Sequence, residues 1–200
     1  MGDPVGAPEG PALAPPSSSP GSPARAPSPP GAYRGTLRQD EFTVPLRDGP
    51  LQIKVTPLAE EVITLAAPDT YDRLSALLES RRAEASRRTG LDAPTLFLVS
   101  LFSHEPDTRF QAEDLHLIHQ GRLLRPRAIL PLTPGWSGAQ RLGRQATESA
   151  IYVFDPEIDL DQPLVVRYGR SESDAWARII LRLRAERARA GSSGNPGREG

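Results

Sequence analysis

The fold of this chain is decided by residues 42–55, FTVPLRDGPLQIKV. Apolar and polar residues alternate on both sides of Asp48-Gly49, and the apolar positions are Phe42, Val44, Leu46, Leu51, Ile53 and Val55. A period of two places alternate side chains on one face of a strand, and Asp-Gly is a preferred hairpin turn. We therefore predict a β-hairpin whose six apolar side chains share a buried face.

The only nearly unbroken apolar run is LFLVSLF, residues 96–102. It lies between Pro94 and the turn-forming residues HEPD, 104–107. Such a run is too short for a stable helix and fits a strand that is covered on both faces. We place it at the centre of the fold.

Further strands are expected at residues 61–65, 114–119, 123–130, 150–154 and 164–168, with turn-forming residues between them. Two segments show the helical period instead, near residues 70–88 and 173–189. The first ends before Gly90, and the second carries Trp176, Ile179, Ile180 and Leu183 on one face and arginines on the other. Short strands with two peripheral helices indicate a mainly β (α+β) antiparallel sandwich.

The two ends of the chain differ from the part between them. Residues 1–35 are rich in Pro, Ser and Ala, and residues 191–200 are similar in miniature, so we predict a disordered tether, a single domain over residues 36–190 and a disordered tail. A leader of this composition is typical of the segment that follows a cleaved signal or a lipid anchor. The protein is therefore expected to be extracytoplasmic or lipid-anchored if the N-terminus has been trimmed, and cytoplasmic otherwise.

Composition excludes several function classes. With 24 basic and 25 acidic residues the net charge is −1, which argues against a specific nucleic-acid binder. The chain has no cysteine, which excludes disulfides, thiolate zinc sites, iron–sulfur clusters and thiol nucleophiles. Lys54 is the only lysine. No apolar run reaches the length of a transmembrane helix, so we predict a soluble chain. We predict no cofactor, because the sequence has no phosphate-binding glycine loop.

The histidines His104, His116 and His119 are close in sequence. On a strand, positions three apart point to opposite faces, so His116 and His119 would not share a metal ion easily. We favour a surface His116 and a hydrogen-bonded inner His119. The competing prediction is a metal-assisted hydrolase or metal-binding protein that uses His116, His119, Asp114 and Glu113.

Two other motifs resemble sites without meeting their requirements. Residues 155–161, DPEIDLD, lack the glycine and glutamate of a helix–loop–helix calcium loop, so a solvated acidic turn is favoured. Residues 135–139, GWSGA, fit a relaxed nucleophile elbow, but no strand directly precedes the serine and every histidine lies upstream of it. We predict no catalytic residue in either motif.

A binding surface is predicted around Trp136, which lies in the Pro/Gly-rich loop 131–138. Its indole either plugs the end of the sandwich or anchors a partner. The arginines of the predicted surface are Arg122, Arg125, Arg127, Arg141 and Arg144. They either form a positive stripe for an anionic partner or pair with Asp114, Glu148 and Asp155.

Residues 110–122, 131–136, 150–154 and 164–168 together resemble the second half of an immunoglobulin-like module of exported bacterial proteins. The resemblance covers about 60 residues and rests on the rhythm of the strands. It implies an immunoglobulin-like β-sandwich with an accessory, binding role, and carries no functional residue across; the helix near 70–88 departs from its simplest form. We predict a non-enzymatic interaction or accessory module whose partner is another protein or an anionic surface.

Overall fold

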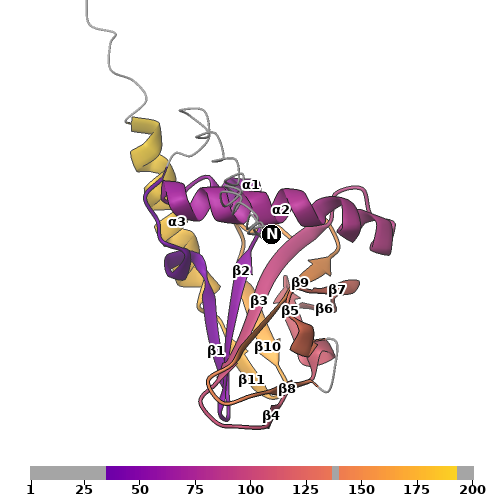
Figure 1. Cartoon of the computed structure of the whole chain (residues 1–200). Helices are drawn as coiled ribbons and strands as arrows, with labels where there is room; N and C mark the ends of the chain where they lie inside the picture. Colours follow the sequence, from indigo (N-terminus) through magenta and orange to yellow (C-terminus); the bar gives the residue numbers. More distant parts are fainter. Residues whose placement is uncertain (1–34, 137–139, 193–200) are drawn as a thin grey trace, which may run out of the picture.

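The computed structural model describes residues 35–136 and 140–192 of the 200-residue chain (Figure 1). The predicted tails, residues 1–35 and 191–200, lie outside the described residues apart from Gly35, Gly191 and Ser192. Gly35 is buried, and the other two residues belong to the last helix. The folded domain therefore extends slightly past its predicted limits at both ends.

The larger sheet has five antiparallel strands in the order β1-β2-β3-β9-β7. These strands are β1 (Val44–Asp48), β2 (Leu51–Pro57), β3 (Thr95–Ser103), β9 (Thr147–Phe154) and β7 (Ala128–Pro131). β3 occupies the centre, and its residues Leu96, Phe97, Leu98 and Val99 are buried on both faces of the sheet. This confirms the prediction of a central, covered strand.

The β1–β2 hairpin has the predicted register. Val44 pairs with Val55 and Leu46 with Ile53, and all four side chains are buried. In the turn, Gly49 has a φ of +54°, in the left-handed region that glycine adopts with less strain than a residue with a Cβ. Phe42 is also buried, but it lies in a 3₁₀ helix, η1 (Gln39–Phe42), and not in the strand as predicted.

The smaller sheet has four antiparallel strands in the order β11-β10-β5-β6. These strands are β11 (Ser171–Ser173), β10 (Leu164–Tyr168), β5 (Leu115–His119) and β6 (Arg122–Leu124). Alternate residues of β5 and β10 are buried in the core that both sheets share, so one face of the smaller sheet points inward. This arrangement agrees with the predicted antiparallel β-sandwich.

Short elements complete the connections between the sheets. β4 (Thr108–Arg109) pairs with β8 (Arg141–Leu142). One 3₁₀ helix, η2 (Ala112–Asp114), leads into β5, and another, η3 (Pro134–Trp136), follows β7. The Tyr152 hydroxyl on β9 donates a hydrogen bond of 2.5 Å to the carbonyl oxygen of Ala112. The larger sheet is thereby joined to the segment that enters β5.

Helix α2 (Pro68–Thr89) agrees with the helix predicted near residues 70–88. It begins at Pro68, a residue favoured in the first turn, and ends at Gly90, whose φ is +72°. Figure 1 shows α2 crossing one end of the larger sheet, where it contacts β7 and β9. No helix in the described part of the chain is long and apolar enough to cross a membrane.

Helix α3 (Trp176–Ser192) has the predicted buried face, formed by Trp176, Ile179, Ile180 and Leu183. The Nε1–H of Trp176 donates to the carbonyl oxygen of Leu160 over 3.1 Å, which fixes the first turn. The helix starts later than predicted because residues Ser171–Ser173 pair with β10 as strand β11. α3 packs against η1 and β10, beside the β1 edge of the sandwich.

Two predicted strands are wrong. Residues 61–65 were expected as a strand, but helix α1 (Glu60–Ile63) occupies this segment, with the Ile63 N–H bonded to the carbonyl oxygen of Ala59. The strand expected at residues 123–130 is divided between β6 and β7, which belong to different sheets. Pro126 lies at the break and has no N–H to offer a strand ladder.

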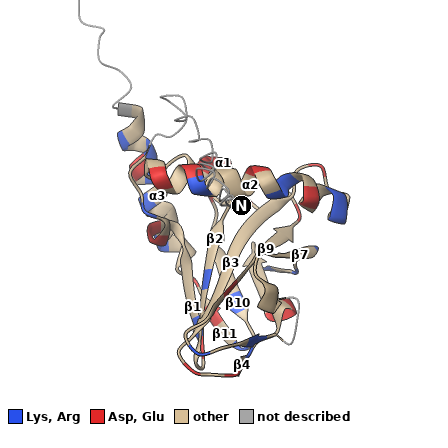
Figure 2. Ribbon diagram, in the orientation of Figure 1, with Lys and Arg blue, Asp and Glu red and all other residues tan. Residues whose placement is uncertain are grey.

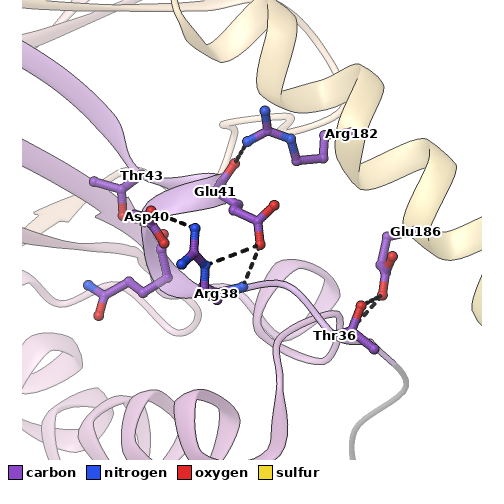
Figure 3. Close-up of polar contacts among 8 residues, drawn as sticks. Thr36, Arg38, Asp40, Glu41, Thr43, Arg182 and Glu186 are labelled. Carbon is purple, nitrogen blue, oxygen red and sulfur yellow. Dashed lines mark hydrogen bonds and ion pairs between the residues drawn. The ribbon is translucent and has the colours of Figure 1, made fainter.

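The start of the domain is attached to its last helix through a contact that we call the Thr36–Glu186 clasp (Figure 3). One Glu186 carboxylate oxygen accepts the backbone N–H of Thr36 at 2.6 Å and its hydroxyl at 3.0 Å. Next to it, the Leu37 N–H donates to the carbonyl oxygen of Leu65, and Leu37 accepts from the Ala67 N–H. Glu186 is 2% exposed whereas Thr36 is exposed, so the clasp lies at the margin of the core.

Candidate functional site

Trp136, the centre of the predicted binding loop, lies in the core with 3% of its surface exposed. Its ring packs against Phe110 and Tyr152 at centroid distances of 5.1 and 6.0 Å. Its Nε1–H has no hydrogen-bond partner among the described residues, which do not include positions 137–139. An anchor role requires an exposed indole, whereas this indole is buried, as the plug alternative requires.

The five predicted binding arginines lie in two parts of the fold. Three belong to β6 and the segment before β7, and two belong to β8 and the turn after it. Arg127 is 2.9 Å from Asp155 and Arg122 is 3.8 Å from Glu157, so the acidic turn at 155–161 compensates both charges. Arg125, Arg141 and Arg144 form no ion pair within residues 35–136 and 140–192. Binding by this set stays a prediction.

The histidines are separated as their strand positions predict. His119 is buried, with Nδ1 3.4 Å from the Pro163 carbonyl oxygen and Nε2 accepting the Asp159 N–H at 3.4 Å. His116 lies on the other face, 2.9 Å from the carbonyl oxygen of Asp114, and His104 is exposed. The described residues contain no group of three or more side chains that could hold a metal ion, so His116, His119 and Asp114 are not assembled for the alternative site.

Of the two remaining motifs, the structure describes the acidic turn. Asp161 of the acidic turn is bonded to Arg187, and Asp155 to Arg127, which agrees with a solvated turn. Ser137, the serine of the relaxed elbow, and the two residues after it lie outside the described residues.

A hollow that none of these predictions named lies between α3, η1 and the first two strands of the larger sheet. We call it the α3 groove; its volume is about 410 Å³. It is lined by Asp40, Glu41, Thr43, Pro45, Lys54, Ala175, Arg178, Ile179 and Arg182. Figure 3 shows η1 and α3 facing each other across part of it.

Hydrogen bonds hold the sheet side of the α3 groove in place. The Thr43 hydroxyl donates to the carbonyl oxygen of Gln39 at 2.7 Å and lies 2.7 Å from the Thr56 hydroxyl. The Gln39 side-chain amide donates to the same Thr56 hydroxyl at 3.2 Å. These bonds attach η1 to β2, so this side of the groove is held in place before a ligand binds.

The cations of the α3 groove are not neutralised. Lys54 and Arg178 are exposed, and neither side chain forms an ion pair or hydrogen bond in the described part of the chain. Arg182 donates to the backbone carbonyl oxygen of Glu41 at 2.9 Å and to no carboxylate there (Figure 3). The positive charges of all three side chains are therefore available to a ligand.

The two acidic residues on the rim have a cation of their own. Arg38 lies 3.5 Å from the Asp40 carboxylate and 4.0 Å from that of Glu41 (Figure 3). Its backbone N–H also donates to Glu41 at 2.9 Å. Because Arg38 faces both carboxylates, they offset the groove's cations less than their number suggests.

Sequence reasoning missed this groove because its walls come from distant parts of the chain. Lys54 lies on the solvent side of the hairpin, whereas Arg178 and Arg182 lie one turn apart on α3. The one available signal was that Lys54 is the only lysine. Comparisons with models of protein families, with curated proteins and with solved structures found no match to this chain.

Proposed function

We propose that the domain is a non-enzymatic binding module that holds an acidic segment of another protein in the α3 groove. The observation that supports this is the convergence of Lys54, Arg178 and Arg182 on one concave surface, where none of them has a carboxylate partner among residues 35–136 and 140–192. Cations gathered in a cleft raise the local concentration of an anionic partner and accelerate its capture.

The residue types suit carboxylates. A guanidinium group presents two parallel N–H donors that match the two oxygens of a carboxylate, and an ammonium group acts as a mobile point charge. Ala175 and Ile179 add an apolar strip on the α3 side of the same groove. An acidic segment with small apolar side chains therefore fits both the charge and the lining.

The test uses peptides selected on the purified protein from a random phage-displayed library, together with labelled polyglutamate. Binding is measured by fluorescence anisotropy for the unaltered protein, Lys54→Glu, Arg178→Glu and the matched control Arg125→Glu. We expect each groove reversal to weaken binding about tenfold, because a favourable contact of about 1.4 kcal/mol becomes repulsive or is lost. The control, which reverses an exposed arginine outside the groove, should change affinity less than about twofold.

Selected peptides should be rich in Asp and Glu, and their affinity should fall as salt is raised, since screening weakens exposed charge pairs. Loss of binding in Arg125→Glu with unchanged binding in Lys54→Glu would move the site to the arginines around β6 and contradict the proposal. Equal effects of all three reversals would show a general charge effect and would contradict it as well.

A further inference from the structure

The outer face of the larger sheet continues the α3 groove away from α3. Strand pairing places Pro45, Lys54, Ser100 and Ser149 in one row across β1, β2, β3 and β9. The next row, two residues along each strand, contains Arg47, Gln52, Phe102 and Thr147. None of these eight residues is buried, so this end of the face is open to solvent.

Two hollows on this face adjoin the α3 groove. One, of about 260 Å³, lies over β1 and β2, and the other, of about 430 Å³, lies over β2, β3 and β9. Lys54 lines both hollows and the α3 groove itself. The three together form one surface, which we call the sheet furrow, with Lys54 near its middle.

The sheet furrow is cationic and polar, with one apolar position. Arg47 and Lys54 are the only charged residues in the two rows. The hydroxyls of Ser100 and Ser149 lie 2.9 Å apart and leave lone pairs and a proton for a ligand. Phe102 is half-buried, and its ring meets His104 edge-on at a centroid distance of 4.6 Å.

We propose that the acidic segment is bound in an extended conformation along the sheet furrow, with an apolar side chain placed on Phe102. This inference rests on the proposed function and names the form of its partner. Four adjacent strands span about 14 Å, and an extended chain advances about 3.3 Å per residue. A segment of about six or seven residues therefore reaches from Arg178 on α3 to Phe102 and Thr147, whereas a compact anion occupies only one hollow.

The experiment compares labelled peptides made of Asp and Glu by fluorescence anisotropy in low salt. A seven-residue peptide has a leucine at its centre, a second has serine there, and a third is a three-residue acidic peptide; citrate serves as a compact anion in competition. We expect the leucine peptide to bind at least about threefold more tightly than the serine peptide and about tenfold more tightly than the short peptide. Citrate should compete weakly.

Two variants locate the apolar contact and the course of the segment. Phe102→Ser should remove the preference for leucine over serine, whereas Leu123→Ser, which alters a 47% exposed leucine on the opposite sheet, should keep it. Gln52→Glu should weaken the seven-residue peptides about fivefold by adding a charge between Lys54 and Phe102, whereas Gln111→Glu should leave them unchanged. Thermal melting shows whether Phe102→Ser folds. If it does not fold, the effect of Gln52→Glu on peptide affinity tests whether the segment runs along the sheet furrow.

The outcomes separate this inference from the proposed function. If all three peptides bind alike, or if neither Phe102→Ser nor Gln52→Glu has an effect while Lys54→Glu and Arg178→Glu do, the ligand is confined to the α3 groove and the extended segment is wrong. If none of these peptides binds, and Lys54→Glu and Arg178→Glu also leave the binding of selected peptides and polyglutamate unchanged, the proposed function itself is wrong. Preference for leucine that depends on Phe102 supports the extended segment.

Discussion

Gly35 illustrates how the absence of one side chain fixes the start of the folded domain. A Cβ at this position would overlap the backbone carbonyl of Leu65, in the segment that pairs with Leu37. Gly35→Ala should therefore lower the free energy of unfolding by about 1–3 kcal/mol or more, because backbone must move to admit a methyl group. Urea unfolding measures the change.

The matched control for this substitution is Gly191→Ala. Gly191 lies in α3, and nothing would contact its added Cβ within 4 Å. Alanine is the better helix former by up to about 1 kcal/mol, so this variant should be unchanged or slightly more stable. An equal loss in both variants would contradict the packing explanation for Gly35.

Trp136 gives a second test at the scale of one residue. Its ring fills space between Phe110 and Tyr152, and truncating a large buried aromatic side chain costs about 3–5 kcal/mol. Trp136→Ala should therefore lower the melting temperature strongly. An unchanged melt combined with lost peptide binding would instead restore Trp136 as a surface anchor, and anisotropy with the selected peptides measures that binding.

At the scale of elements, the hairpin register has a sharp consequence. Ile53 is 1% exposed, whereas its neighbour Gln52 lies half-exposed on the sheet furrow. Ile53→Asp should cost about 3–5 kcal/mol because it buries a charge without a partner. Gln52→Asp should cost less than about 1 kcal/mol. Denaturant midpoints of the two variants measure these changes. Similar losses of stability would contradict the assignment of Ile53 to the buried face and Gln52 to the exposed face.

Patterns that extend over a whole element were sufficient to predict it. The alternation in residues 42–55 and the apolar run at residues 96–102 gave the hairpin and the central strand, and the helical periods gave α2 and α3 within a few residues. The short run at residues 61–65 was ambiguous, because Val62 and Ile63 suit a strand by propensity but are buried equally well on one turn of helix. At residues 123–130, Pro126 indicates a break in the strand, because proline has no N–H for a strand ladder.

At the scale of the whole molecule, the candidate site could not be predicted, because its charges meet only after folding. Lys54 and Arg178 are far apart in sequence and line one groove only because α3 packs beside the edge of the larger sheet. The spacing of residues within one segment does not show which residues of distant segments become neighbours. For a related reason, pattern alone does not place Arg122 and Arg127 near carboxylates, because the turn at residues 155–161 approaches them only in the folded chain.

The two sheets are also joined through tyrosine hydroxyls, and this predicts an alkaline limit to stability. Tyr152 donates to the carbonyl oxygen of Ala112, and Tyr168 accepts the N–H of Gln111 at 2.8 Å. Burial raises the pKa of both phenols above the ordinary value of 10.0. The folded state therefore keeps a proton that the unfolded state loses above pH 10, and stability should fall as pH rises past that value.

The slope should approach about 1.4 kcal/mol per pH unit for each tyrosine that stays protonated in the folded state. Urea midpoints measured from pH 8 to pH 12 provide the test. The chain has one lysine and no cysteine, so few other groups titrate in this range. Tyr152→Phe should be less stable at pH 8 but show a shallower decline, and a pH-independent midpoint in the unaltered protein would contradict the argument.

The Thr36–Glu186 clasp has a consequence for how the protein is made. It joins residues 150 positions apart, so it can form only when the last helix has been synthesised and has left the ribosome. Until then β1 lacks α3 beside it, and a nascent sheet with an uncovered edge strand is a template for pairing with other chains. This domain therefore cannot complete its folding before α3 has emerged, and chaperones that shield strand edges should associate with the nascent chain until α3 docks.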